Sequence, residues 1–163
     1  MSILILGFKS CGKSTLGQSL SQDLSLPFYD TDELIAKAFQ KASAREVFVT
    51  LGEKSFRNNE QKILMDLSKQ KACIVATGGG IVEHETCNKW IEKFKLRIFL
   101  DAPLEEIKAR IDPSYVFYHQ LEERYALRYK HYLKLSNIHI KIAGLNLTEI
   151  SLSTLEAIHP YGQ

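Results

Sequence analysis

The sequence has little cysteine and no arrangement of it that suggests a disulfide framework. Its three cysteines form no C-x-x-C pair, so we expect reduced thiols and neither disulfides nor a zinc site. Neither sign of charge dominates, since 21 Lys and Arg residues stand against 19 Asp and Glu residues, interspersed along the chain. This balance argues against a nucleic-acid partner. Long apolar runs are also missing, because the run Ile3 to Leu6 is too short for a signal peptide or a membrane span. We therefore expect a cytoplasmic protein with small-molecule partners.

What is present is a regular alternation of strand and helix patterns. With 163 residues, 45% of them hydrophobic, the chain fits one domain over residues 1–163, which we expect to be a monomer. Continuous apolar runs of strand length are typical of a parallel sheet covered on both faces. The sequence thus predicts an α/β, three-layer sandwich with a five-stranded parallel sheet. The predicted strands are residues 3–6, 26–29, 73–76, 96–100 and 138–142.

A phosphate-binding loop directly follows the first predicted strand. Gly7 to Thr15 reads Gly-Phe-Lys-Ser-Cys-Gly-Lys-Ser-Thr and satisfies G-x-x-x-x-G-K-[ST]. In such a P-loop, backbone N–H groups curl around phosphates, Lys13 reaches the β and γ phosphates, and the Ser14 hydroxyl binds Mg²⁺. Lys13 is therefore a candidate catalytic residue as well as a ligand of ATP. The candidate ATP-binding residues in this loop are Lys9, Ser10, Cys11, Gly12, Lys13, Ser14 and Thr15.

Two carboxylates follow the second predicted strand, at Asp30 and Asp32. Aspartate is also a common helix N-cap, so a purely structural role stays open. Beside a P-loop, one carboxylate can instead hold Mg²⁺ through its waters while the other accepts a hydrogen bond from a substrate hydroxyl.

Two further patterns fall near the same edge of the predicted sheet. Arg57 and Glu60 stand one helical turn apart, either as an ordinary surface ion pair or as part of a site. Gly78, Gly79 and Gly80 follow the third predicted strand. A glycine run can be a simple loop, but at a strand end it lets a ligand approach bare N–H groups.

Together these motifs resemble shikimate kinase. They are the P-loop, Asp-Thr-Asp at 30–32, Phe-Arg-x-x-Glu at 56–60, the glycine run at 78–80 and Arg-x-x-x-Tyr at 128–132. The resemblance implies a nucleoside-monophosphate-kinase-like fold. It also implies transfer of the γ-phosphoryl group of ATP to the 3-hydroxyl of shikimate, with Mg²⁺, in aromatic amino-acid biosynthesis.

The resemblance also implies a role for individual residues. Lys13 and Asp32 would be catalytic, Ser14 and Asp30 would serve the metal, and Arg110 would lie at the adenine or swing inward to the phosphate. An arm over about residues 31–60 would bind substrate. The implied substrate-binding residues are Asp32, Phe48, Phe56, Arg57, Glu60, Gly78, Gly79, Gly80 and Arg128.

The sequence departs from the family pattern in two places. The family carries an arginine on a flexible lid that reaches the transferring phosphate, whereas the shortened lid here, about residues 111–123, has no Lys or Arg. Arg110 and Arg124 are candidate replacements. In the P-loop, Lys9 and Cys11 are unusual for the family. Lys9 is expected to point to solvent or to add charge near the nucleotide, and Cys11 to form a thiolate whose oxidation would block ATP.

Three alternatives to the implied activity stay open at this point. One is another small-metabolite kinase of this fold, such as a gluconate-type kinase. Another is a homologue impaired in its lid, which binds ATP and shikimate but turns over poorly. A third is a P-loop binding module or switch. A GTPase is disfavoured because the sequence has neither Asn-Lys-x-Asp nor Asp-x-x-Gly.

Overall fold

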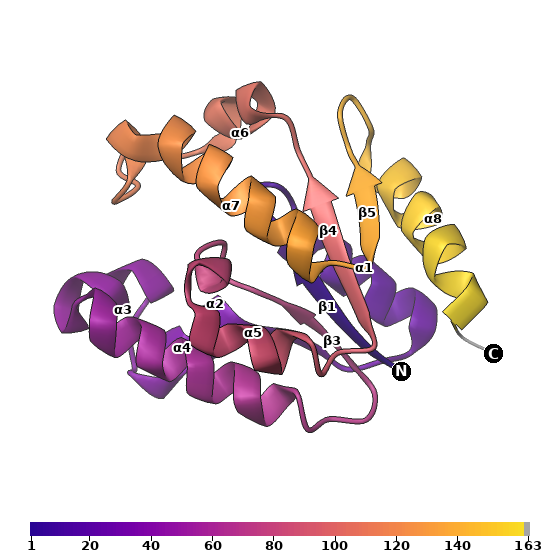
Figure 1. Ribbon diagram of the computed structural model, residues 1–163, viewed down its shortest axis with the longest axis horizontal. Coiled ribbons are helices and arrows are strands. Elements are labelled where there is room, and N and C mark those ends of the chain that lie inside the picture. Colours follow the sequence, from indigo (N-terminus) through magenta and orange to yellow (C-terminus); the bar gives the residue numbers. More distant parts are fainter. Residues whose placement is uncertain (162–163) are drawn as a thin grey trace.

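Five parallel strands form one sheet in the order β2-β3-β1-β4-β5 in the computed structural model, which describes residues 1–161 (Figure 1). The strands are β1 (Ser2–Leu6), β2 (Phe28–Asp30), β3 (Cys73–Ala76), β4 (Leu96–Asp101) and β5 (Ile138–Lys141). The predicted five-stranded parallel sheet is therefore confirmed. The second strand begins at Phe28 rather than at Leu26. Pro27 precedes it, and the Pro27 carbonyl accepts a hydrogen bond from the Ile74 amide.

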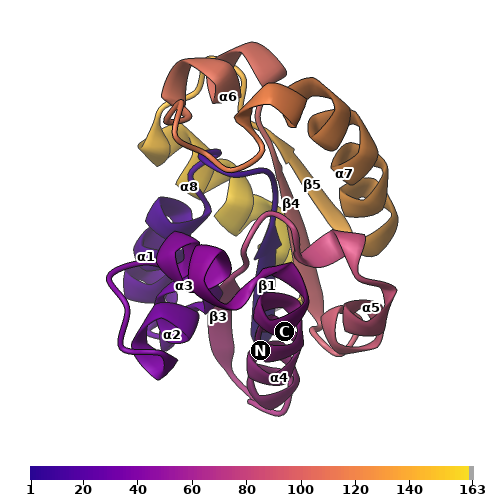
Figure 2. The same cartoon turned by 90° about the vertical axis from the view of Figure 1, so that its left-hand side faces the viewer.

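Helices cover both faces of this sheet. Figure 2 shows α1 and α8 on one side of the strands and α5 and α7 on the other. In the described part of the chain no helix is long and apolar enough to span a membrane. The helices are α1 (Lys13–Leu24), α2 (Thr31–Ala38), α3 (Ala44–Leu51), α4 (Glu53–Leu67), α5 (Glu85–Ile91), α6 (Leu104–Arg110), α7 (Leu121–Leu135) and α8 (Leu147–Ile158), with 3₁₀ turns η1 (Ile81–Glu83), η2 (Tyr118–Gln120) and η3 (His159–Tyr161).

The central strands are buried on both faces, as their unbroken apolar sequences require. Every residue of β3 is buried, and so is every residue of β1 after Ser2. The edge strand β5 instead alternates buried and exposed residues, because Ile138 and Ile140 face the core while His139 and Lys141 face outward. The core thus fixes the central strands, whose carboxyl ends carry Gly7 and Thr77.

The arm, residues 31–60, has a small apolar core of its own. Ile35, Val47 and Phe56 pack together there, apart from the main core around the sheet. The Ser43 hydroxyl accepts a hydrogen bond from the Glu46 amide and so caps α3. Gly52, with φ 78°, ends α3 and lets α4 begin at Glu53. The arm therefore holds its shape while lying at the edge of the domain (Figure 1).

Candidate active site

The P-loop lies between β1 and α1 and presents bare backbone amides. Gly7 has φ 153°, and a Cβ there would lie 2.7 Å from the Leu100 carbonyl oxygen, so no larger residue fits. Ser10 and Gly12 are left-handed, with φ 64° and 99°. No side chain caps α1 at Gly12, which leaves the first amides of this helix free to bind an anion.

Lys13 is folded over the loop that it belongs to. Its side chain is buried, and its Nζ donates a 2.7 Å hydrogen bond to the Phe8 carbonyl. Phe8 is itself buried, and its ring centroid lies 5.6 Å from that of Tyr125 on α7. Apolar packing of Phe8 against Tyr125 thus anchors the loop to α7.

Asp30 caps a helix and also contacts the P-loop. Its Oδ1 caps α2 by accepting hydrogen bonds from the amides of Asp32 and Glu33, at 2.9 and 3.4 Å. Its Oδ2 accepts a hydrogen bond from the Ser14 hydroxyl. Ser14 and Asp30 therefore bring two hard oxygen ligands together at the phosphate loop, which is the donor set that Mg²⁺ prefers.

Asp32 lies on the other side of this pair, beside the glycine run. A Cβ on Gly78 would lie 2.7 Å from Asp32 Oδ1 and 2.7 Å from Glu60 Oε1, so a glycine is needed between the two carboxyl groups. Burial raises the pKa of the Asp32 carboxyl, and the neighbouring Asp30 raises it further, while Lys13, Lys9 and Arg57 oppose the rise. A carboxylate with a raised pKa in this position can accept a proton.

Arg57 and Glu60 form a buried pair rather than the surface pair that their spacing alone would suggest. Arg57 Nη1 donates a 2.8 Å hydrogen bond to Glu60 Oε2, and Glu60 is 0% exposed. Burial raises the pKa of Glu60 to about 7, against the opposing effect of Arg57. Gly80 lies directly under the Arg57 guanidinium, where a Cβ would clash. Arg57 also lies over the rings of Phe48 and Phe56, 5.9 and 5.3 Å from their centroids.

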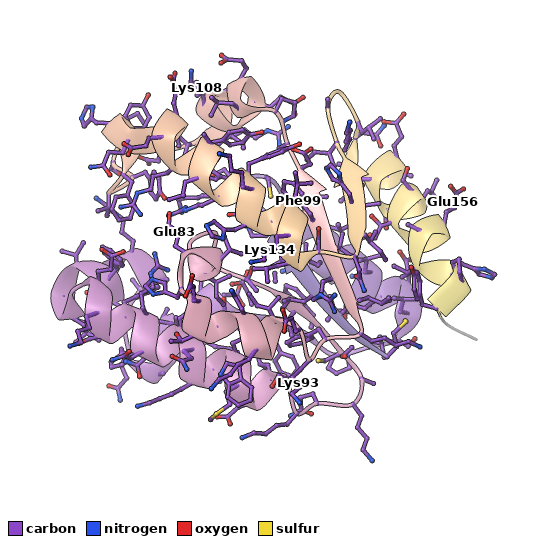
Figure 3. The ribbon with its side chains drawn as sticks, in the orientation of Figure 1. Glu83, Lys93, Phe99, Lys108, Lys134 and Glu156 are labelled. Atoms are coloured by element: carbon purple, nitrogen blue, oxygen red, sulfur yellow. The ribbon has the colours of Figure 1, made fainter. Side chains whose placement is uncertain are left out.

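Arg128 is held by residues that the sequence analysis missed. Its Nε donates a 2.8 Å hydrogen bond to Glu83, whose side chain lies beneath α7 (Figure 3). Burial would raise the pKa of Glu83, but hydrogen bonds from Arg128 and Arg124 outweigh it and lower the pKa. One signal could have found Glu83. It is an acid three residues after the glycine run, while Arg124 and Arg128 share one helix face.

Tyr132 and Thr31 were also missed, and both fix the glycine run. The Tyr132 hydroxyl donates to the Gly79 carbonyl, and Thr31 Oγ1 accepts a 2.9 Å hydrogen bond from the Gly78 amide. Tyr132 completes the Arg-x-x-x-Tyr pattern, so only the role of its hydroxyl was unforeseen. These contacts hold the run at the strand edge.

The P-loop, Asp30, Asp32, Arg57, Glu60, the glycine run and Arg128 line one cavity of about 730 Å³, whereas the supporting residues Thr31, Glu83 and Tyr132 do not line it. The P-loop lines one side, and the arm, the glycine run, Arg128 and the lid line the rest. Of the predicted site residues, those that line it are Lys9, Ser10, Gly12, Lys13, Ser14, Thr15, Asp30, Asp32, Phe48, Phe56, Arg57, Glu60, Gly78, Gly79, Gly80 and Arg128.

Comparison with known proteins decides the family. The family model described as shikimate kinase matches residues 9–159. The chain belongs to the shikimate kinase family. A shikimate kinase from Aquifex aeolicus is 36% identical over 114 residues, which are 70% of this chain and 67% of that protein. Among the first curated shikimate kinases, from plants and bacteria, the aligned segment spans 35% to 67% of the relative's length.

The solved structures agree with this placement. The crystal structure of the Aquifex aeolicus shikimate kinase superimposes with a TM-score of 0.87 at 29% identity, covering 99% of this chain and 98% of that one. A gluconokinase from Sinorhizobium meliloti, at 15% identity and a TM-score of 0.63 over 98% of this chain and 92% of that one, shares the fold alone. The shikimate kinase fold is thus the better match at nearly full coverage.

Arg110 is one of two predicted site residues, with Cys11, that do not line the cavity. Its side chain is 47% exposed and pairs with Glu106 at 3.0 Å on the surface of α6. The expectation that Arg110 swings inward to the phosphate is therefore not met in this arrangement, because the ion pair turns the guanidinium toward solvent. Its position beside adenine stays a prediction.

Cys11 is the second departure from the shikimate kinase expectations. It is 1% exposed and does not line the cavity, and burial raises the pKa of its thiol despite the nearby Lys13. The prediction of a Cys11 thiolate was wrong, because desolvation of the buried sulfur outweighs the ammonium group and the helix N-terminus. Oxidation of Cys11 therefore has no special chemical driving force in this loop.

Proposed function

We propose that this protein transfers the γ-phosphoryl group of ATP to the 3-hydroxyl of shikimate. The observation that carries the proposal is the pairing within one cavity of a P-loop with a half-buried carboxylate, Asp32, and two buried arginines, Arg57 and Arg128. A small carboxylated triol needs such a set, since an arginine fork binds its carboxylate and an acid accepts from its hydroxyl.

The chemistry is an in-line displacement with no covalent intermediate. The hydroxyl oxygen attacks the γ-phosphorus, the bond from that phosphorus to the β,γ-bridging oxygen breaks, and ADP leaves. Asp32 orients the hydroxyl and takes its proton. Lys13 leaves the Phe8 carbonyl to contact the β and γ phosphates, and the free amides of α1 bind the same oxygens.

We also propose that Ser14 and Asp30 hold Mg²⁺. Their oxygens already face one another, and one Asp30 oxygen is fixed by its capping bonds to α2. When bound, the ion would neutralise charge on the β and γ phosphates. Asp30→Ala should therefore weaken Mg²⁺-dependent binding of ATP, as measured by titration of the nucleotide with and without the ion.

A coupled ADP-release assay with and without shikimate tests the proposed activity. We expect turnover that depends on shikimate and is absent with gluconate and other polyol acids. Turnover with gluconate instead would favour the gluconate-type kinase. Binding of both ATP and shikimate by calorimetry, without turnover, would favour the impaired homologue.

We further propose that the protein acts as a monomer in the cytoplasm. All of the groups invoked above come from one chain. Light scattering at micromolar concentration tests the first point. Cell fractionation tests the second, since the curated relatives include chloroplastic as well as bacterial proteins.

A further inference from the structure

Some of the cationic side chains that line the cavity are not paired with a carboxylate that the structure describes. Five such residues line it: Lys9, Lys13, Arg45, Arg57 and Arg128. The last two donate to Glu60 and Glu83, and Lys13 donates to a carbonyl. Within residues 1–161, Lys9 and Arg45 have no carboxylate within 4 Å. These two exposed cations are therefore available to a ligand.

Lys9 lies where the P-loop meets the glycine run. A Cβ on Gly79 would lie 3.0 Å from the Lys9 backbone nitrogen, so the two loops are in direct contact at this residue. The next residue, Ser10, turns left-handed with φ 64°, which carries the chain on toward Lys13. Lys9 thus lies at the boundary between the P-loop and the loop beside Asp32.

The Lys9 side chain reaches across the cavity mouth toward the lid. Its Nζ lies 5.6 Å from the centroid of the Tyr115 ring. Its charge opposes the rise in the pKa of Asp32, and it adds to the hydrogen bonds from Ser114 and the charge of Arg45 that lower the pKa of Asp112. The ammonium is therefore placed among the P-loop, the acid of the acceptor site and the lid.

Other cations near the lid are less well placed. Arg124 is committed to Glu83 at 2.8 Å, lies 4.0 Å from the Phe117 ring centroid and does not line the cavity. Arg110 pairs with Glu106 outside the cavity. Arg45 lines the cavity but belongs to α3 on the arm, and its charge lowers the pKa of Asp112 on the lid, after the larger effect of hydrogen bonds from Ser114. Among residues 1–161, Lys9 is left as the cation at the loop junction that has no carboxylate partner.

We propose that Lys9 binds the transferring phosphoryl group and supplies the positive charge that the lid of this chain lacks. In phosphoryl transfer a cation at the equatorial oxygens stabilises charge that develops in the transition state. The flexible lysine side chain can leave the face of Tyr115 for a phosphate, because a cation over a ring at an exposed site is weakly held. This role rests on the proposed kinase activity.

The test compares Lys9→Met, Lys9→Arg and Lys134→Met. Lys134 is exposed near the end of α7 (Figure 3), so its variant controls for the loss of one positive charge. We expect Lys9→Met to lower kcat about 100-fold, Lys9→Arg to recover most of it, and Lys134→Met to match wild type. Lys9→Gln serves as a second neutral variant, and a melting curve for each checks the fold.

A second readout needs no acceptor. Lys9→Met should weaken binding of ATP about 10-fold while changing that of ADP by less than about 2-fold, because only ATP carries the γ-phosphate. Equal losses for the two nucleotides, or an unchanged kcat, would overturn the proposal. If wild type shows no turnover with shikimate, the proposed activity fails, while the comparison of ATP with ADP still decides whether Lys9 contacts the γ-phosphate.

Discussion

The P-loop side and the acceptor side of the cavity are held by different forces. On the P-loop side, residues 7–15, the apolar side chain of Phe8 and the thiol of Cys11 are buried in the main core. On the acceptor side, buried charges pair with one another, as Arg57 does with Glu60 and Arg128 with Glu83. The lid is anchored near its ends. Ile111 and Leu121 are buried there, whereas Asp112 to Ser114 between them are exposed.

This difference separates binding of the nucleotide from recognition of the acceptor. Apolar packing changes little with pH or with moderate salt, so the P-loop geometry should change little with either. Buried ion pairs depend on each partner remaining in its charge state. Substitutions on the acceptor side should therefore alter acceptor binding and chemistry while leaving affinity for ATP almost unchanged.

Asp32→Asn gives the largest expected effect and the strongest test of that separation. We expect kcat to fall about 10² to 10⁴-fold, because the amide cannot take the hydroxyl proton. The Kd for ATP should stay within about 3-fold of wild type, since Lys13 and the amides of α1 are untouched. Asp66→Asn, at a carboxylate that is 69% exposed, is the matched control. Equal losses in kcat and ATP affinity would contradict a role at the hydroxyl.

Arg57→Ala should have the next largest effect, on binding of shikimate. Removing one partner of a charge-assisted contact costs about 2 to 5 kcal/mol of binding free energy. Glu60 would then be left without its cation, but it can take up a proton, since its pKa is already about 7. Calorimetry measures the Kd for shikimate. Arg57→Lys keeps the charge without the fork and should lose less. An unchanged Kd in Arg57→Ala would show that the carboxylate binds elsewhere.

Much of the P-loop side could be predicted from the sequence, because its geometry follows from residues close together in the chain. The spacing of Gly7, Gly12 and Lys13 fixes a loop between a strand and a helix, and the structure has that loop. The five-stranded sheet was predictable for a similar reason, since its strands are marked by unbroken apolar runs.

The partners on the acceptor side were not predictable, because they depend on tertiary contacts. Glu83 and Arg128 are 45 residues apart and meet only when η1 packs under α7. The buried state of Arg57 and Glu60 had the same origin, since their spacing equally fits a surface pair. The prediction of a thiolate at Cys11 was wrong for a similar reason. Its position near a helix N-terminus favours a thiolate, but burial, which the sequence does not reveal, opposes it more strongly.

Glu60→Gln tests the charges on the acceptor side through stability alone. Burial raises the pKa of Glu60 from an ordinary 4.5 to about 7 in the folded protein. The folded state therefore binds more protons than the unfolded state between these values, so this group's contribution to stability is full below about pH 4.5 and is lost by about pH 7. Glutamine has no such proton.

The measurement is the free energy of unfolding in urea at several pH values for both proteins. As pH rises from about 4.5 to about 7, the unfolding free energy of wild type should fall by up to about 3 kcal/mol relative to that of Glu60→Gln. A difference that is flat between pH 4.5 and pH 7 would show that Glu60 keeps an ordinary pKa when folded.

Phe117→Ala should have the smallest effect and bears on how the lid closes. The Phe117 ring centroid lies 5.8 Å from that of Phe48 on the arm and 4.0 Å from the Arg124 guanidinium, so this ring joins the lid to the arm and to α7. Losing these contacts should make the free energy of lid closure less favourable by about 0.5 to 1.5 kcal/mol, and so raise the KM for shikimate by up to about 10-fold. Phe117→Tyr keeps the ring and is the control.

Because the closing contact with Phe48 is apolar, the KM ratio between Phe117→Ala and wild type should be the same at low and high salt. A ratio that falls as salt rises would mean that the Arg124 contact, not the ring pair, closes the lid.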